Sequence, residues 1–346
     1  MKNLLFLTFL LFVLAGCKKS SQNEYIIGAI LPITGERALM GELGKNGLLL
    51  AEKYLNDSIF KEKKIKLVIE DGAGVPTKSL NGLSKLLNYD KSNIVFSIVS
   101  GVDFAILPIQ EKESFLFISH TTHPALSGVN SLVFRHSPTL NQELKLIELF
   151  SENKNNVFLF MNDEYSVPLK DSLVNRSIIN KQNCISFDKN MTEFSEISLL
   201  SMKNSPKQII ISGTGPILAD LVNKLRDNGY KGDILTTLGF IVTGAMEKVK
   251  DKTNLYSINF TKVEINEKFS PLISEFRKKE GRDITSSEII FFNSLYMIGT
   301  AISNGATSIE EISTYIRKME NFQGLGEVIT VNNLNDIEPL LEVYKY

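Results

Sequence analysis

The sequence predicts an α/β protein made of two doubly wound lobes, each a mostly parallel sheet with helices on both faces. Three observations predict this fold. Short apolar runs of strand type alternate with longer segments of helical spacing. The alternation breaks near Pro138 and then resumes. About 330 residues follow the N-terminal apolar segment, enough for two domains of roughly 150 residues each.

The first half of the chain supplies five predicted strands and three predicted helices. Pro76 suits the first turn of a helix, because its missing N–H would have no partner there. The strands are expected at 25–31, 65–70, 94–99, 115–118 and 132–134. The helices are expected at 42–56, 76–87 and 103–112. Leu140 then opens a second series with the same rhythm.

The second series predicts the other lobe. Its helices are expected at 140–151, 165–180, 194–202 and 217–228, and its strands at 157–161, 184–187, 208–211 and 234–236. The remaining chain supplies strands at 255–259, 327–331 and 340–343 and helices at 271–279, 287–303 and 309–319. Ligands of open parallel sheets bind beyond the carboxyl ends of the strands. The loops to inspect are therefore 32–41, 100–103, 119–124, 162–165, 212–215 and 237–239.

The N-terminus predicts export. A basic start with Lys2 precedes the run 4–13, in which only Thr8 is polar, and Leu14-Ala15-Gly16-Cys17 follows. This is the pattern of a secretory signal over 1–16, and the run is too short to remain as a membrane span. The last four residues resemble the lipobox of bacterial lipoproteins, which implies a lipid on Cys17 and a tether over 17–23. The alternative is an ordinary signal peptide with a cysteine nearby.

The composition limits the kinds of partner that this protein is expected to bind. Lys2 is the only charged residue of the signal, so 37 basic and 39 acidic residues remain, for a net charge of −2. That balance, without a basic stretch interleaved with aromatics, gives no sign of a nucleic-acid partner. If Cys17 carries lipid, Cys184 has no partner for an intramolecular disulfide.

A series of short segments along the chain is informative as a set. The series opens with Ile27-Gly28-Ala29-Ile30-Leu31-Pro32-Ile33-Thr34-Gly35. It continues with Met40-Gly41, Asn46-Gly47, Glu70-Asp71, Ser100, Phe117-Ile118-Ser119, Thr122-His123-Pro124, Asn162-Asp163-Glu164-Tyr165 and Leu225-Arg226-Asp227-Asn228-Gly229. This series resembles the branched-chain amino-acid (leucine/isoleucine/valine-binding) family of type I periplasmic binding proteins, and its order and spacing match along nearly the whole mature chain. The family's disulfide is missing, because Gly74 and Val99 occupy its two positions.

The resemblance implies two lobes joined by three crossings, with a ligand cleft between them. Lobe 1 would take 24–138 and 260–322, and lobe 2 would take 139–259 and 323–346. The lobes would close over a small ligand and deliver it to the membrane permease subunits of an ABC importer. The family is not catalytic and uses no cofactor.

The resemblance also implies the ligand residues on lobe 1. Ser100 would bond a ligand carboxylate at a helix start, where free N–H groups favour an anion, and Gly101 would let the backbone come close. The alternative for Ser100 is a helix N-cap. Thr122 would be a second carboxylate contact, with Thr121 in its place if the loop is offset. Met40 falls where a family tyrosine lines the mouth, which allows an apolar ligand portion.

On lobe 2, Tyr165 would close over the ligand, with a half-buried aromatic at a helix start as the alternative. Thr214 falls where the family often has an aromatic. The family pairs the ligand ammonium with an acidic residue at the position of Leu238. A buried ammonium without a carboxylate is costly. Either another acid replaces it, or the ligand is not a free α-amino acid; the acids in question are Asp103, Asp163 and Glu164.

Other motifs predict no chemistry. The loop 212–215 has two glycines of a dinucleotide fingerprint, but Leu218 holds the third position. His120 and His123 lack a third metal ligand, so no metal site is expected, and His136 is expected to be structural. No nucleophile–base or paired-carboxylate arrangement suggests an enzyme.

Two alternatives to an importer's binding component stay open. Some lipoproteins of this fold activate cell-wall synthases through protein contacts, although those usually carry an added helical domain. A ligand sensor that signals to a membrane kinase would use the same cleft.

Overall fold

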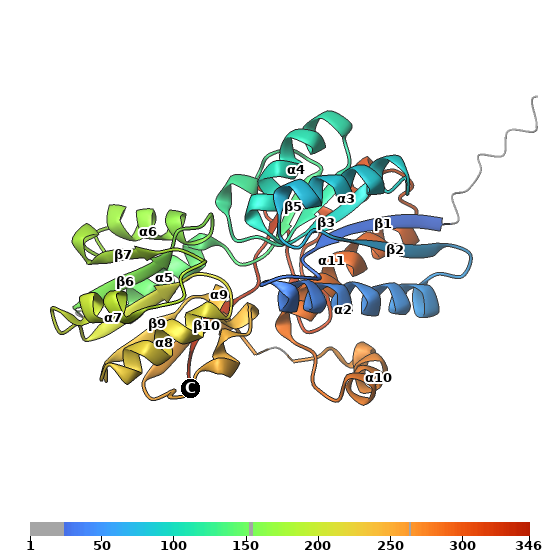
Figure 1. The fold of residues 1–346 in the computed structure, drawn as a ribbon. Helices are drawn as coiled ribbons and strands as arrows, with labels where there is room; N and C mark the ends of the chain where they lie inside the picture. Colours follow the sequence, from blue (N-terminus) through green and yellow to red (C-terminus); the bar gives the residue numbers. More distant parts are fainter. Residues whose placement is uncertain (1–23, 152–154, 263) are drawn as a thin grey trace, which may run out of the picture.

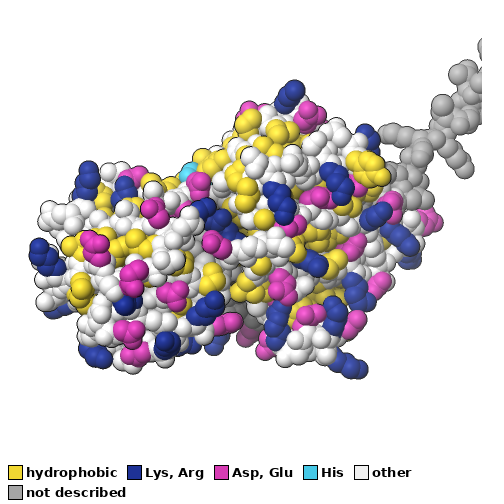
Figure 2. Space-filling view, in the orientation of Figure 1, with side chains coloured by type: hydrophobic (Ala, Val, Ile, Leu, Met, Phe, Trp, Pro, Cys, Tyr) yellow, Lys and Arg dark blue, Asp and Glu magenta, His cyan; other side chains and the backbone are white. Residues whose placement is uncertain are grey.

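The computed structural model describes residues 24–151, 155–262 and 264–346, and these form two six-stranded sheets flanked by helices (Figure 1). The signal segment 1–16, Cys17 and the tether to residue 23 lie outside the described residues. Within the described ranges, no helix combines the length and the apolar character needed to cross a bilayer. Figure 2 shows acidic and basic side chains interspersed over the visible face of both halves, as the nearly neutral composition predicts.

The first sheet has the strand order β13-β5-β4-β3-β1-β2, and all its pairings are parallel. Its strands are β1 (Glu24–Leu31), β2 (Lys64–Asp71), β3 (Ile94–Ser97), β4 (Leu116–Ser119), β5 (Val133–His136) and β13 (Asp336–Ile337). The inner strands β1, β3 and β4 are mainly apolar and buried on both sides, because helices cover both faces. One face packs against α3 (Pro76–Asn88) and α4 (Ser100–Glu113). The other packs against α2 (Ala38–Tyr54), α10 (Ser270–Glu280), α11 (Ser286–Ser303) and α12 (Ile309–Ile316).

The second sheet repeats this layering with the order β14-β10-β9-β8-β6-β7. Its strands are β6 (Asn156–Met161), β7 (Cys184–Phe187), β8 (Gln208–Ser212), β9 (Asp233–Thr236), β10 (Leu255–Phe260) and the antiparallel edge strand β14 (Leu341–Lys345). α5 (Leu140–Ser151) and α6 (Ser166–Asn175) pack on one face. α7 (Ser195–Met202) and α8 (Ile217–Asp227) pack on the other, and α9 (Leu238–Val242) follows β9.

Short single turns complete the chain, and none of them alters the layering. They are η1 (Leu55–Ile59), η2 (Pro124–Leu126), η3 (Lys181–Asn183), η4 (Ala245–Lys248) and η5 (Glu267–Phe269). The chain passes between the two sheets three times: after β5, after β10 and after β13. The expected α/β class with two sheets and three crossings is confirmed.

The expected boundary near residue 322 is wrong. The hairpin of β11 (Phe322–Gln323) and β12 (Val328–Ile329) packs on the first sheet, and β13 pairs with β5. The reason is hydrophobic, because the first core buries Leu325, Ile329 and Ile337. The third crossing therefore comes after residue 337, and residues 323–337 lie with the first lobe instead of the second.

Several helices also differ from expectation, among them α4, α6 and α9. α4 begins at Ser100, three residues earlier than predicted, because extended Val99 leads directly into the first turn. α6 ends at Asn175 instead of 180, and Ser177 just beyond it has a left-handed φ of 58° that a continuing helix cannot accept. The five-residue helix α9 was not predicted, because it is too short to produce a helical period.

A buried ion pair fastens two of the crossings together. Arg135, at the end of β5, donates from Nε to Asp336 Oδ1 at 3.1 Å and from Nη2 to Asp336 Oδ2 at 2.7 Å. Both side chains are almost fully buried. Arg135 Nη1 also donates to the carbonyls of Thr122 and Pro138, at 3.3 and 3.5 Å. The guanidinium thus ties β5, β13, the first crossing and the 119–124 loop to one point.

Arg135→Met should lower the free energy of unfolding by about 3–5 kcal/mol, because it leaves the Asp336 carboxylate buried without a partner. Denaturant unfolding measures this loss. Lys53→Met is the matched control, because it removes a cation from the exposed Lys53–Asp57 pair and should leave stability nearly unchanged. A loss below about 1 kcal/mol in Arg135→Met would contradict the anchoring role.

Candidate functional site

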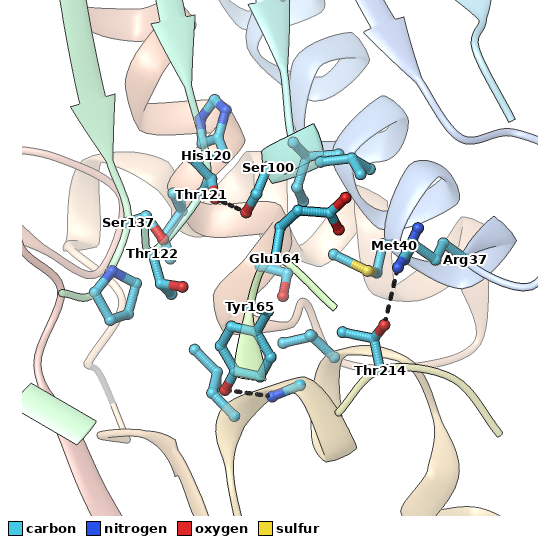
Figure 3. A pocket seen from close by; sticks show the side chains of 18 of the residues that line it. Arg37, Met40, Ser100, His120, Thr121, Thr122, Ser137, Glu164, Tyr165 and Thr214 are labelled. Atoms are coloured by element: carbon cyan, nitrogen blue, oxygen red, sulfur yellow. Dashed lines mark hydrogen bonds between the residues drawn. The ribbon is translucent and has the colours of Figure 1, made fainter. Parts of the chain in front are cut away.

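A cavity of about 110 Å³ lies between the two sheets, at the carboxyl ends of their strands. One water needs roughly 10–15 Å³ on this measure, so the cavity has room for a small organic molecule. Its lining includes Met40, Ser100, Gly101, Thr121, Thr122, Tyr165, Thr214 and Leu238, which are all eight residues predicted from the sequence (Figure 3). Their binding of a ligand stays a prediction.

The first lobe offers hydroxyl groups at the start of α4. Ser100 is the first residue of the helix and Val99 is its N-cap, so the alternative of Ser100 as the cap is wrong. No side chain caps this helix, and its first N–H groups lie beside the cavity. Ser100 Oγ instead hydrogen-bonds Thr121 Oγ1 from the loop after β4. Hydroxyls and helix N–H groups together make a site suited to an anion.

The loop after β4 presents both threonines to the cavity. Thr121 is buried against Ser100, and its Oγ1 accepts from the N–H of His123 at 3.4 Å. Thr122 is half-buried, and its carbonyl is the one held by Arg135. The buried ion pair at the crossings therefore fixes the backbone of this loop directly.

The second lobe forms the opposite wall around a buried carboxylate. Glu143 on α5 is fully buried and accepts from the Tyr165 hydroxyl at 3.0 and 2.8 Å. It also accepts from the N–H of Leu238 at 3.1 Å, and the N–H of Gly239 donates to the Tyr165 oxygen at 3.3 Å. The Tyr165 ring lines the cavity while its hydroxyl is satisfied inside its own lobe.

Burial shifts the pKa values of Glu143 and Tyr165 in this wall. Burial raises the pKa of Glu143 to about 7, although the hydrogen bonds from Leu238 and Tyr165 act in the opposite direction. The pKa of Tyr165 lies well above its usual value, because the ring is buried and the Glu143 carboxylate disfavours a second negative charge.

The three acids considered as replacements for Leu238 lie in different surroundings. Asp103 does not line the cavity; it is fully buried, accepts from the Ser119 hydroxyl, and burial raises its pKa to about 7. Asp163 and Glu164 both line the cavity. Asp163 Oδ1 accepts from the N–H groups of Tyr165 and Ser166, at 3.2 and 2.8 Å.

The second oxygen of Asp163, Oδ2, is buried without a protein partner. Burial raises the pKa of this carboxyl, while the bonds from Ser166 and the positive charge of Arg37 lower it. A buried acceptor oxygen that lacks a donor, in a residue facing a cavity, suits a cationic or N–H-bearing ligand group.

The two lobes touch across the cavity. Arg37, just before α2, donates from Nη2 to Thr214 Oγ1 at 3.1 Å (Figure 3). A Cβ atom on Gly101 would lie 3.3 Å from Glu164 Oε1, and one on Gly244 would lie 2.8 Å from Leu39. A side chain at either glycine would therefore contact the other lobe, and the Glu164 or Leu39 side chain would have to move to make room for it.

The histidines near the cavity are engaged within the protein. The Nε2 of His120 and the Nδ1 of His136 both bond Ser294 Oγ, at 3.0 and 2.8 Å, and the His120 ring stacks on Phe291 at 3.8 Å. His136 Nε2 lies 3.2 Å from Glu327 Oε2. Among the described residues, no group of three or more His, Cys, Asp or Glu could hold a metal ion.

Two residues that build the site, Glu143 and Arg37, were not predicted from the sequence. Glu143 falls in the apolar stripe of its helix with Leu140, Leu144 and Ile147, and an acid in such a stripe was a usable signal. Arg37 lies in a polar loop, and nothing in its sequence surroundings marks it.

The chain belongs to the periplasmic binding protein family, because the family model matches residues 24–333. Members of this family bind solutes, so the protein is a binding protein and not an enzyme. A search of curated protein sequences finds no match.

Solved structures share the fold at low sequence identity. The branched-chain amino acid transporter substrate binding protein LivJ of Streptococcus pneumoniae, in complex with isoleucine, is 19% identical with a TM-score of 0.81, over 93% of this chain and 96% of that one. The leucine binding protein LivK of Thermotoga maritima is 20% identical with a TM-score of 0.79, over 93% and 95%. A type 1 periplasmic binding protein of Bordetella pertussis is 13% identical with a TM-score of 0.77, over 94% and 96%.

The raised pKa of Glu143 predicts a pH-dependent stability. The pKa of this carboxyl is about 4.5 in the unfolded chain, its ordinary value, and about 7 in the folded chain. The contribution of Glu143 to the free energy of unfolding should therefore be lost as pH rises from 4.5 to 7. Denaturant unfolding of Glu143→Gln should show a flatter profile than the wild type over that range. An unchanged profile would contradict the burial of an ionisable group here.

Proposed function

We propose that the protein is the lipid-anchored, extracytoplasmic solute-binding component of an ABC importer, and that it captures a small amino acid or a related carboxylate or amide by closure of its lobes. The observation that carries this proposal is one cavity lined by the start of α4 on one lobe and, on the other, by Asp163, whose Oδ2 is buried without a protein partner. Lobe 1 would take 24–138 and 261–337, and lobe 2 would take 139–260 and 338–346.

The ligand carboxylate would bind at the start of α4. Ser100 and Thr121 supply hydroxyls there, Thr122 lies on the same loop, and Gly101 leaves the backbone N–H accessible. Charge-assisted hydrogen bonds of this kind are each stronger than neutral ones. The rest of the lining favours an apolar ligand portion, since it includes Met40, Ile98, Leu238, Val242, Ile290 and Phe291.

The ligand ammonium would pair with Asp163. Leu238 cannot supply a charge, Asp103 lies outside the cavity, and Glu164 is exposed near the mouth. Asp163 Oδ2 has the missing hydrogen bond that an ammonium donor would supply. The free amino acid therefore remains the favoured ligand class despite Leu238.

The lipid anchor and the delivery of the ligand to permease subunits are supported by other observations. The lipobox-like Leu14-Ala15-Gly16-Cys17 supports a lipid on Cys17. The pneumococcal relative is described as a transporter binding protein, which supports permease subunits as partners. A sensor or a cell-wall synthase activator of the same fold is the alternative, favoured only by the absence of an acid at residue 238.

A thermal-shift screen tests the binding role. The chain from Lys18 onward contains every described residue and would be screened with amino acids, amides, carboxylates, short peptides and cell-wall fragments. A ligand at 100 times its Kd should stabilise the fold by about 2.7 kcal/mol, a shift of a few degrees. Ser100→Ala should reduce the shift strongly. A flat panel with amino acids near millimolar would contradict amino-acid capture and direct attention to a protein partner.

Asp163→Asn tests the ammonium contact. With isoleucine as the probe, this variant should bind at least about 30-fold more weakly, because truncating one partner of a buried charge pair costs about 2–5 kcal/mol. Its affinity for 3-methylpentanoic acid, which lacks the amine, should not fall. Glu164→Gln is the matched control and should change the isoleucine affinity only slightly in a calorimetric titration. An equal loss of isoleucine affinity in Asp163→Asn and in Glu164→Gln would refute the assignment of the ammonium contact to Asp163.

A further inference from the structure

Glu143 holds together the three segments that build the lobe 2 wall. The carboxylate comes from α5, the Tyr165 ring from the start of α6, and Leu238 from the start of α9. Four hydrogen bonds of 2.8–3.3 Å link Glu143, Tyr165 and the N–H groups of Leu238 and Gly239. Glu143 itself does not line the cavity, whereas Tyr165, Leu238 and Gly239 do.

The packing around this cluster leaves little freedom. A Cβ atom on Gly239 would lie 2.2 Å from the carbonyl oxygen of Gly213 and 3.0 Å from the Tyr165 ring, so only glycine fits there. Without an acceptor in its buried position, the Tyr165 hydroxyl and the Leu238 N–H would both lose a hydrogen bond. The wall would then have to rearrange at the residues that face the ligand.

The Glu143 carboxylate lies directly behind the backbone of Leu238. The acid that the resemblance leads one to expect at residue 238 is absent, yet the backbone of Leu238 bonds a carboxylate from the interior. The only titratable side chain in contact with Glu143 among the described residues is Tyr165 from α6; α9 contributes backbone N–H groups only. No described Lys, Arg or His forms an ion pair with this carboxylate.

We propose that Glu143 is a positioning residue of the ligand site, which in its ionised form holds Tyr165 and the start of α9 in the arrangement that binds ligand. Ligand binding is thereby coupled to the loss of one proton from the interior of lobe 2. The coupling to ligand binding rests on the proposed function. The positioning of Tyr165 and α9 by Glu143 rests on the hydrogen-bond cluster alone.

The coupling has a definite sign. Ionisation strengthens the hydrogen bonds that Glu143 Oε2 accepts from the Tyr165 hydroxyl and the Leu238 N–H, because bonds to a charged acceptor are stronger. In the neutral form, a proton on Oε1 displaces the second contact with Tyr165. A ligand that binds only the ionised form has an apparent affinity reduced by the ionised fraction. With the midpoint at about 7, isoleucine should bind roughly tenfold more weakly at pH 6 than at pH 8.

A ligand-free experiment tests the structural part. In the ¹⁵N-labelled chain from Lys18 onward, the amide signals of Leu238 and Gly239 should titrate together with one midpoint near 7. Glu143→Gln should abolish that common titration. Glu148→Gln, which removes an exposed carboxylate from the same helix, should preserve it. Amide signals that do not titrate in the wild type, or that still titrate in Glu143→Gln, would overturn the proposal.

A calorimetric titration with isoleucine between pH 5.5 and 8.5 tests the functional part. The wild type and Glu148→Gln should lose affinity below pH 7, while Glu143→Gln should bind weakly with a nearly flat profile. Tyr165→Phe keeps the carboxylate and the fold, and should weaken binding while the Leu238 amide still titrates. A wild-type affinity independent of pH would overturn the coupling. If isoleucine binds at no pH, the proposed ligand fails, and the amide titration still decides the positioning role.

Discussion

The buried ion pair between Arg135 and Asp336 is the interaction on which the rest of the architecture depends. It joins β5 to β13, the two strands that precede the first and third crossings. The same guanidinium holds the carbonyls of Thr122 and Pro138, so the cavity loop and the crossing share one anchor. A binding protein that closes by moving whole lobes needs rigid lobes and compliant connections. Arg135 makes the lobe 1 side of the connection rigid.

The two walls of the cavity place their polar groups differently. On lobe 1, the site is built from the start of a 14-residue helix and from hydroxyls that bond one another, so its polarity is exposed to the ligand. On lobe 2, the polarity is mostly hidden, because Glu143 lies beneath Tyr165 and Leu238. Asp163 is the exception, with one oxygen used by its own backbone neighbours and the other left free. The arrangement suits a ligand with one anionic end, one cationic end and an apolar body.

The sequence was sufficient to predict the fold and the cavity lining, because both follow from local patterns. Apolar runs mark the strands, and the residues just after them must gather at one edge of a parallel sheet, as Ser100, Thr121 and Thr214 do. The contacts of Arg37 with Thr214 and of Glu143 with Leu238 join segments more than 90 residues apart, so no local pattern gives these partners, although Glu143 stands out as an acid in an apolar helix stripe. The boundary at 322 failed for a related reason, because the short strand β13 has only two residues and its partner β5 lies 200 positions earlier.

The most direct test of this account is a crystal structure of the chain from Lys18 onward in complex with the amino acid that gives the largest thermal shift. The account predicts ligand density between the lobes, with the carboxylate against Ser100 and Thr121 and the ammonium within hydrogen-bonding distance of Asp163 Oδ2. Density at another surface, or a ligand in the cleft with its ammonium directed away from Asp163, would contradict it.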